Sequence, residues 1–207
     1  MNTHSQLDLP PLDLGRLVAL IDGVFAVAMT LLVLDLKLPS DTGDLVSALK
    51  QMLPGVLVYL IVFASIAGYW TIHHFTFRYI LHGDGRLVVL SLINLLFVTL
   101  YPVTASIVGA HPLEPLATVC LSANSLLYCL SAWAVWSYAA AHSQLLTEDA
   151  ERHALQRVAK IMLLVAFCLA LALPLAYLSV SLAYADWILC APVAAAWGGG
   201  RLQKSHR

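Results

Sequence analysis

An acidic side chain stands inside the first apolar stretch of the sequence. Asp22 lies six residues after Arg16, and the residues around it are almost all apolar. A carboxylate inside an apolar helix is costly, so it normally faces protein or water and has a polar partner. Arg16 is a poor partner within one helix, because six residues rise about 9 Å along the axis. Asp22 is therefore expected to bind a side chain from another helix of the same subunit.

Four polar side chains in later apolar segments have the chemistry to bind Asp22. Tryptophan and histidine donate hydrogen bonds, and asparagine both donates and accepts. The candidates are Trp70, His73, His74 and Asn94. Adjacent histidines on a helix point about 100° apart, so His73 and His74 form a poor chelate and no metal site is predicted. We expect the four candidates to form a structural polar network with Arg16 and Asp22.

The segments that carry these side chains are apolar enough to lie in a membrane. Of the 207 residues, 60% are hydrophobic and 11% are charged, whereas soluble domains carry about 25% charged residues. A spanning helix needs about 20 mostly apolar residues. The chain offers six such segments in one transmembrane domain over residues 1–207, at about 17–38, 49–72, 87–110, 115–140, 158–180 and 181–197. The lipid bilayer is thus a predicted partner, and the absence of a basic stripe argues against nucleic acid.

Lysine and arginine placement predicts the orientation of these segments. Cytoplasmic loops of membrane proteins are enriched in both residues. Nine of the eleven lie in the N-terminal segment, the second and fourth connections and the C-terminal tail. An even number of spans with both termini in the cytoplasm fits this distribution. The predicted class is an all-α, multi-pass protein of the cell membrane.

Prolines and aromatic residues add expectations about helix shape and depth. Proline inside a helix removes a hydrogen bond and favours a kink, which is expected at Pro54, Pro102 and Pro174. Aromatic rings gather at membrane interfaces. The aromatic cluster of the fourth segment is expected to form such a belt, with Tyr128, Trp133, Trp136 and Tyr138.

One face of the first segment forms a continuous stripe. At 100° per residue, the stripe contains Arg16, Leu20, Gly23, Val27, Thr30, Leu31 and Leu34. Asp22, Phe25 and Met29 fall on the opposite side. Ordinary helix packing is the commonest role of such a pattern. The functional alternative is a pore lining, in which apolar rings gate by dewetting.

The first segment resembles a family signature. The stretch from Arg16 through Asp22 to Asp35 is similar to the first helix of bacterial relatives of the endolysosomal potassium channel transmembrane protein 175. That signature is an arginine, three residues, Phe-Ser-Asp, Gly-Val-Phe-Ala and a Thr-Leu-Leu run. Further matches are Tyr69-Trp70-Thr-Ile-His73-His74, Leu92-Ile-Asn94-Leu-Leu-Phe and Tyr101-Pro102. The resemblance covers about residues 14–140.

The resemblance implies a homotetramer that conducts K⁺ passively and carries no cofactor. First helices would surround the pore, with a constriction at Val27, Leu31 and Leu34 and a selectivity layer at Thr30. A bacterial inner membrane is the implied location. The chain departs from the signature at Leu20-Ile21, which stand in place of Phe-Ser. The missing serine hydroxyl would alter the polar cluster around Asp22.

Two other function classes would require features that differ from those of a channel. A secondary transporter of a small solute or ion would place polar or charged groups at mid-membrane and often has an internal repeat. Asp22 is the candidate acid, but it lies near the cytoplasmic end of its segment, and the sequence shows no repeat. An intramembrane enzyme would need a nucleophile–base pair or metal ligands within the spans. No such set is found, so no catalytic residue is predicted.

Overall fold

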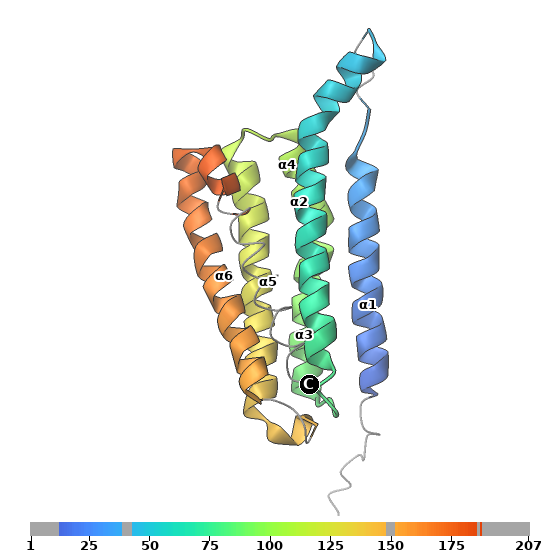
Figure 1. Cartoon of the computed structure of the whole chain (residues 1–207), viewed down its shortest axis with the longest axis vertical. Coiled ribbons are helices and arrows are strands. Elements are labelled where there is room, and N and C mark those ends of the chain that lie inside the picture. The colour runs from blue at the N-terminus through green and yellow to red at the C-terminus, as the bar shows by residue number, and fades with distance from the viewer. Residues whose placement is uncertain (1–12, 39–42, 148–151, 186, 188–207) are drawn as a thin grey trace, which may run out of the picture.

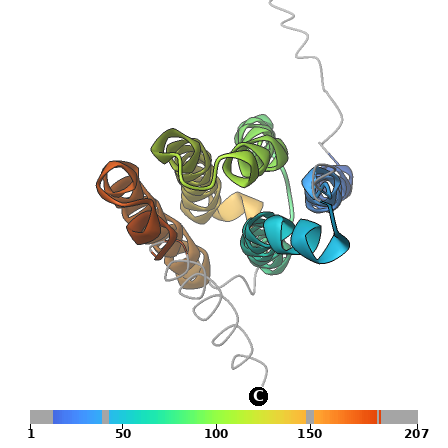
Figure 2. The same cartoon turned by 90° about the horizontal axis from the view of Figure 1, so that it is seen from above.

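The structure is a computed structural model, and it describes residues 13–38, 43–147, 152–185 and 187. These residues form a bundle of helices that stand side by side (Figures 1 and 2). In chain order the helices are α1 (Leu14–Leu31), η1 (Leu32–Asp35), α2 (Leu45–Phe77), α3 (Gly85–Thr99), α4 (Tyr101–Ala110), α5 (Pro115–Ala141), η2 (Ser143–Leu145) and α6 (Arg152–Leu178). Seen from above, α1 and α6 lie at opposite edges of the bundle, and α5 lies between α6 and the α3–α4 pair (Figure 2).

Within the described residues, five stretches are long and apolar enough to cross a membrane. They are Leu14–Asp35, Leu45–Phe77, Gly85–Ala110, Pro115–Ala141 and Leu155–Leu178. The prediction of an all-α fold with several spanning helices is confirmed. Most of the expected sixth segment, 181–197, lies outside the described residues.

α2 is longer than the sequence predicts. It has 33 residues, which correspond to about 50 Å of helix, whereas the hydrocarbon core of a bilayer is about 30 Å thick. Figure 1 shows its first turns extending past the end of α1. One end of α2 therefore extends beyond the bundle.

Aspartate caps start three of the helices. Asp13, Asp44 and Asp84 precede α1, α2 and α3, and each accepts a hydrogen bond at 2.8–2.9 Å from a backbone N–H of the first turn. Such caps satisfy donors that would otherwise have no partner at a helix start. The acids thus set where these helices begin.

Pro102 divides the third expected segment into two helices. α3 ends at Thr99 and α4 begins at Tyr101, because proline has no N–H and its ring clashes with the carbonyl one turn earlier. Near the break, the carbonyl oxygen of Phe97 accepts a hydrogen bond from Asn124 of α5 at 3.1 Å. Pro54 and Pro174 lie inside α2 and α6 and do not interrupt either helix.

The expected aromatic belt on α5 is wrong for two of its four members. Tyr128 and Trp136 are each 3% exposed, whereas Trp133 is 39% exposed. The ring centroid of Tyr128 lies 4.2 Å from that of Tyr69, and that of Trp136 lies 5.7 Å from that of His73. Because α5 is covered by neighbouring helices, these rings fill the core instead of reaching a membrane interface.

At one end of the bundle, the turn between α2 and α3 is hydrogen-bonded to the segment that follows α5. Ile80 and Leu146 form an isolated antiparallel bridge between the α2–α3 turn and the segment after α5. Beside it, the hydroxyl of Tyr138 on α5 donates a hydrogen bond to the carboxylate of Asp84. Desolvation raises the pKa of Asp84, but the hydrogen bonds from Tyr138 and from the Leu87 N–H outweigh it, and the pKa falls below 3.8.

A comparison of two capping acids tests the contribution of the hydrogen bond between Tyr138 and Asp84. Asp84→Ala removes the α3 cap, worth about 1 kcal/mol, together with the bond to Tyr138. Asp44→Ala is the matched control, because the side-chain hydrogen bonds of Asp44 within the described residues go to Ser47 at the start of its own helix. Asp84→Ala should therefore lower the melting temperature of the detergent-solubilised protein more than Asp44→Ala does.

The stabilisation that each of these two acids contributes depends on pH in the same direction. The pKa of Asp44 is also lowered, chiefly by the hydrogen bond from the backbone N–H of Ser47. A carboxylate whose folded-state pKa is depressed stabilises the fold above its ordinary pKa of 3.8, and this stabilisation is lost as the pH falls further. Equal melting temperatures of the two variants at neutral pH would mean that the hydrogen bond between Asp84 and Tyr138 adds no stability.

Candidate functional site

α1 has two faces with different surroundings. Its inner face packs in the core through Leu17, Ile21, Phe25 and Ala28, followed by Leu32 of η1, and these residues are 0–8% exposed. Its outer face carries Leu20, Val27 and Leu31, followed by Leu34 of η1, and these residues are 43–66% exposed. Arg16, Gly23 and Thr30 are exposed as well. The stripe obtained from helical geometry is therefore the side of α1 that the described part of its own subunit leaves uncovered.

The end of the stripe is not α-helical. The expected segment 17–38 corresponds to the stretch Leu14–Asp35, whose last part, from Leu32, is a 3-10 turn, η1. In a 3-10 helix, residues three apart eclipse each other, because each step is 120°. The side chain of Leu34 therefore points in nearly the same direction as that of Leu31, whereas steps of 100° would set the two about 60° apart. Such turns are frequent at the C-terminal ends of α-helices.

Thr30 is the polar member of the stripe between Val27 and Leu34. Its hydroxyl donates a hydrogen bond to the carbonyl oxygen of Val27 at 2.9 Å. A hydroxyl has one proton to donate and two acceptor lone pairs. Since the proton is used within the helix, the oxygen of Thr30 presents acceptor capacity to the exposed side, which suits a cation.

A groove runs beside the stripe. It has a volume of about 380 Å³, and its lining includes Ala19, Leu20, Gly23, Val27 and, from α3, Thr99. Apart from its chain neighbours and the nearby backbone of its own helix, a Cβ placed on Gly23 would meet no described atom within 4 Å. The small side chains on α1 thus leave space on the uncovered side for other atoms to approach the helix backbone.

Asp22 lies on the other side of α1 and binds α2. The indole Nε1 of Trp70 donates a hydrogen bond to its Oδ1 at 2.9 Å. The Trp70 ring stacks on the His74 ring, with centroids 5.2 Å apart. Asp22 and Trp70 are both half-buried, and His74 is exposed.

The remaining residues of the expected network lie elsewhere. Asn94 donates to the carbonyl oxygen of Tyr128 at 3.2 Å and to Oγ of Ser131 at 2.8 Å, and so joins α3 to α5. His73 is 5% exposed, and its ring stacks on that of Phe77 with centroids 4.0 Å apart. Arg16 is exposed in the first turn of α1. Of the six expected residues, all of which the structure describes, only Asp22 and Trp70 share a side-chain hydrogen bond.

Sequence reasoning missed some of the hydrogen-bond partners. No pattern in the sequence links Asn94 to its partners Ser131 and the Tyr128 carbonyl, because these belong to another helix. Ile21, which stands at the signature's serine position, is 1% exposed on the inner face of α1. An aliphatic side chain therefore occupies the place of the missing hydroxyl, and it lines a small cavity beside His73.

Comparisons with known proteins cover the same region. A family model described as endosomal/lysosomal potassium channel TMEM175 matches residues 16–102. A potassium channel of Chamaesiphon minutus is 33% identical over 155 residues, which are 72% of this chain and 76% of the relative. A potassium channel of Streptomyces collinus is 40% identical over 90 residues, which are 42% of this chain and 44% of that relative.

A solved structure shares the fold. The crystal structure of a lysosomal potassium-selective channel TMEM175 homologue from Chamaesiphon minutus matches with a TM-score of 0.76 and 29% identity. The match covers 89% of this chain and 97% of that chain.

The hydrogen bond between Asp22 and Trp70 is testable by substitution. Asp22→Ala leaves the indole N–H without its acceptor, and a hydrogen bond to a charged group contributes about 1.5–3 kcal/mol. We expect a reduced yield of folded protein and a lower melting temperature, with a similar loss for Trp70→Phe. Asp22→Asn is the control, since it keeps an oxygen acceptor and should lose less. Normal yield of Asp22→Ala with altered ion selectivity would contradict a structural role.

Proposed function

The chain belongs to the family of the endosomal/lysosomal potassium channel TMEM175, and on this premise we propose that it is a potassium channel. Conduction is passive and follows the electrochemical gradient. The pore lies on the axis of a homotetramer and is lined by α1 of each subunit. Both termini lie in the cytoplasm, as the distribution of lysine and arginine indicates, and the membrane is a bacterial inner membrane.

The uncovered stripe of α1 is the observation that carries this proposal. A single subunit cannot enclose a pore with one helix, but four copies around an axis can. Leu20, Val27, Leu31 and Leu34 are 43–66% exposed in the single subunit, and in this proposal they face the shared axis. The groove beside Gly23 offers space for a neighbouring helix to pack closely.

Val27, Leu31 and Leu34 form the constriction in this proposal. Eight residues of helix rise about 10 Å, so the three positions give stacked aliphatic rings around the axis. A narrow apolar ring raises a dewetting barrier that limits the current. The 3-10 turn supports the stacking, because it aligns Leu34 with Leu31.

Thr30 forms the selectivity layer. Its hydroxyl proton is held by the Val27 carbonyl, so four threonine oxygens face the axis as acceptors. These oxygens replace part of the water around a passing ion. K⁺ gives up its water at a lower cost than Na⁺, and a site with few ligands therefore favours K⁺.

The constriction predicts a gain of flux in leucine variants. Leu31→Ala widens a ring and lowers the dewetting barrier, so K⁺ flux into proteoliposomes should rise several-fold. Leu57→Ala on α2 is the matched control, because Leu57 is also an exposed leucine, 53% against 43% for Leu31. It should leave the flux unchanged.

Two outcomes would contradict the pore. Equal flux in Leu31→Ala and the parent protein would mean that ions pass elsewhere or do not pass. A purified protein that is monomeric in mild detergent would remove the shared axis, since one copy of α1 cannot surround an ion.

Thr30 predicts a separate phenotype. Thr30→Ala removes the hydroxyl ring and should lower the ratio of K⁺ to Na⁺ flux while conduction persists. Thr71→Ala on α2 is the control, because Thr71 is exposed and its hydroxyl likewise donates to a carbonyl of its own helix, that of Ala67, at 2.8 Å. Both fluxes are measured in proteoliposomes for each variant. An unchanged ratio in Thr30→Ala would exclude Thr30 from the selectivity layer.

A further inference from the structure

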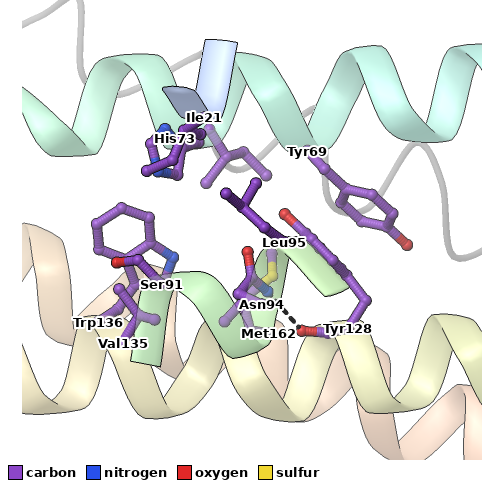
Figure 3. A pocket seen from close by; sticks show the side chains of 12 residues that line it. Ile21, Tyr69, His73, Ser91, Asn94, Leu95, Tyr128, Val135, Trp136 and Met162 are labelled. Atoms are coloured by element: carbon purple, nitrogen blue, oxygen red, sulfur yellow. Dashed lines mark hydrogen bonds between the residues drawn. The ribbon is translucent and has the colours of Figure 1, made fainter. Parts of the chain in front are cut away.

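A small enclosed cavity lies behind α1, where side chains of α1, α2, α3, α5 and α6 meet (Figure 3). Its volume is about 10 Å³, which is close to the space that one water molecule needs, about 10–15 Å³. Most of the lining is apolar, including Ile21 of α1 and Met162 of α6. Polar side chains interrupt it. They include His73 of α2 and Ser91 and Asn94 of α3, besides the polar ends of Tyr69, Tyr128 and Trp136.

Two of these polar groups have no hydrogen-bond partner among the described residues. Nδ1 of His73 and Oγ of Ser91 are buried without a hydrogen bond, in side chains that are 5% and 3% exposed. Buried polar atoms in native proteins are nearly always bonded to protein or to ordered water. Figure 3 shows His73 projecting from α2 toward the side of the cavity that α3 lines with Ser91.

We propose that one structural water molecule binds in this cavity and bridges Nδ1 of His73 to Oγ of Ser91. Water both donates and accepts, so it can serve either neutral tautomer of the histidine and either rotor of the hydroxyl. Asn94 supplies a third contact. Its Nδ2 is already committed to the Tyr128 carbonyl and to Ser131, which leaves its Oδ1 to accept from the water.

Neither an empty cavity nor an ion suits the lining as well. Cavities that stay empty have apolar walls, whereas this one holds two orphaned polar atoms. A bare cation would have no carboxylate among the lining residues, and its desolvation in so small a space is very costly. The water therefore joins α2 to α3 directly behind Ile21, on the inner side of the proposed pore helix.

The sign of one stability change distinguishes a wet cavity from a dry one. If water bridges the two groups, Ser91→Ala removes one of its partners, and the melting temperature of the solubilised protein falls. If the cavity is dry, the same substitution removes an unsatisfied hydroxyl, and the melting temperature rises or stays unchanged. Ser65→Ala is the control, since the Ser65 hydroxyl bonds within its own helix, to the carbonyl of Ile61 at 2.8 Å, and should change little.

A double-mutant cycle and a density map complete the test. His73→Phe replaces the imidazole with an aromatic ring that has no nitrogen. With a bridging water, adding Ser91→Ala to His73→Phe should cost much less than Ser91→Ala alone, whereas without it the two effects add. A map of the parent protein that resolves buried waters should show a peak within hydrogen-bonding distance of both atoms. Additive effects, or the absence of that peak, would overturn the proposal, and the map decides if a variant fails to fold.

Discussion

The outward orientation of the α1 stripe depends on the hydrogen bond between Asp22 and Trp70. In lipid, the hydrophobic effect does not select one apolar helix face over another, because lipid tails are as apolar as leucine. α1 is apolar on nearly all sides, so packing alone leaves its rotation about its own axis weakly determined. The pair with Trp70 selects one rotation, in which Phe25 packs inside and Val27 remains outside.

The rest of the bundle supports this pair through α5. Two asparagines act reciprocally: Asn94 of α3 donates to the Tyr128 carbonyl of α5, and Asn124 of α5 donates to the Phe97 carbonyl of α3. Each bond uses a side chain of one helix and the backbone of the other. Water does not compete for such bonds in lipid, so they specify how α3 and α5 align. The aromatic rings of α5 fill the space beside α2.

The stripe predicted from helical geometry is exposed in the structure, but the direction of Leu34 depends on a local change from α-helix to 3-10 helix. The stripe follows from 100° steps, and these hold through Leu31 because α1 is regular to that point. The turn at η1 then follows a different step, and no residue type in the sequence marks where it begins. The aromatic belt failed for a related reason: Trp133 and Trp136 are the same residue type on one helix, and only the neighbouring helices decide that the first is exposed and the second is buried.

The sequence by itself determined the class of fold, the approximate spans and a short set of possible partners for Asp22, because these follow from hydropathy, from helical period and from the hydrogen-bonding capacity of each side chain. The tertiary structure decided among the partners. It gave Asp22 to Trp70, turned Asn94 toward α5 and left His73 beside an orphaned serine. The physical reason is that a hydrogen bond needs two groups within about 3 Å, and residues as distant in sequence as Asp22 and Trp70 reach that distance only when whole helices have packed in one register.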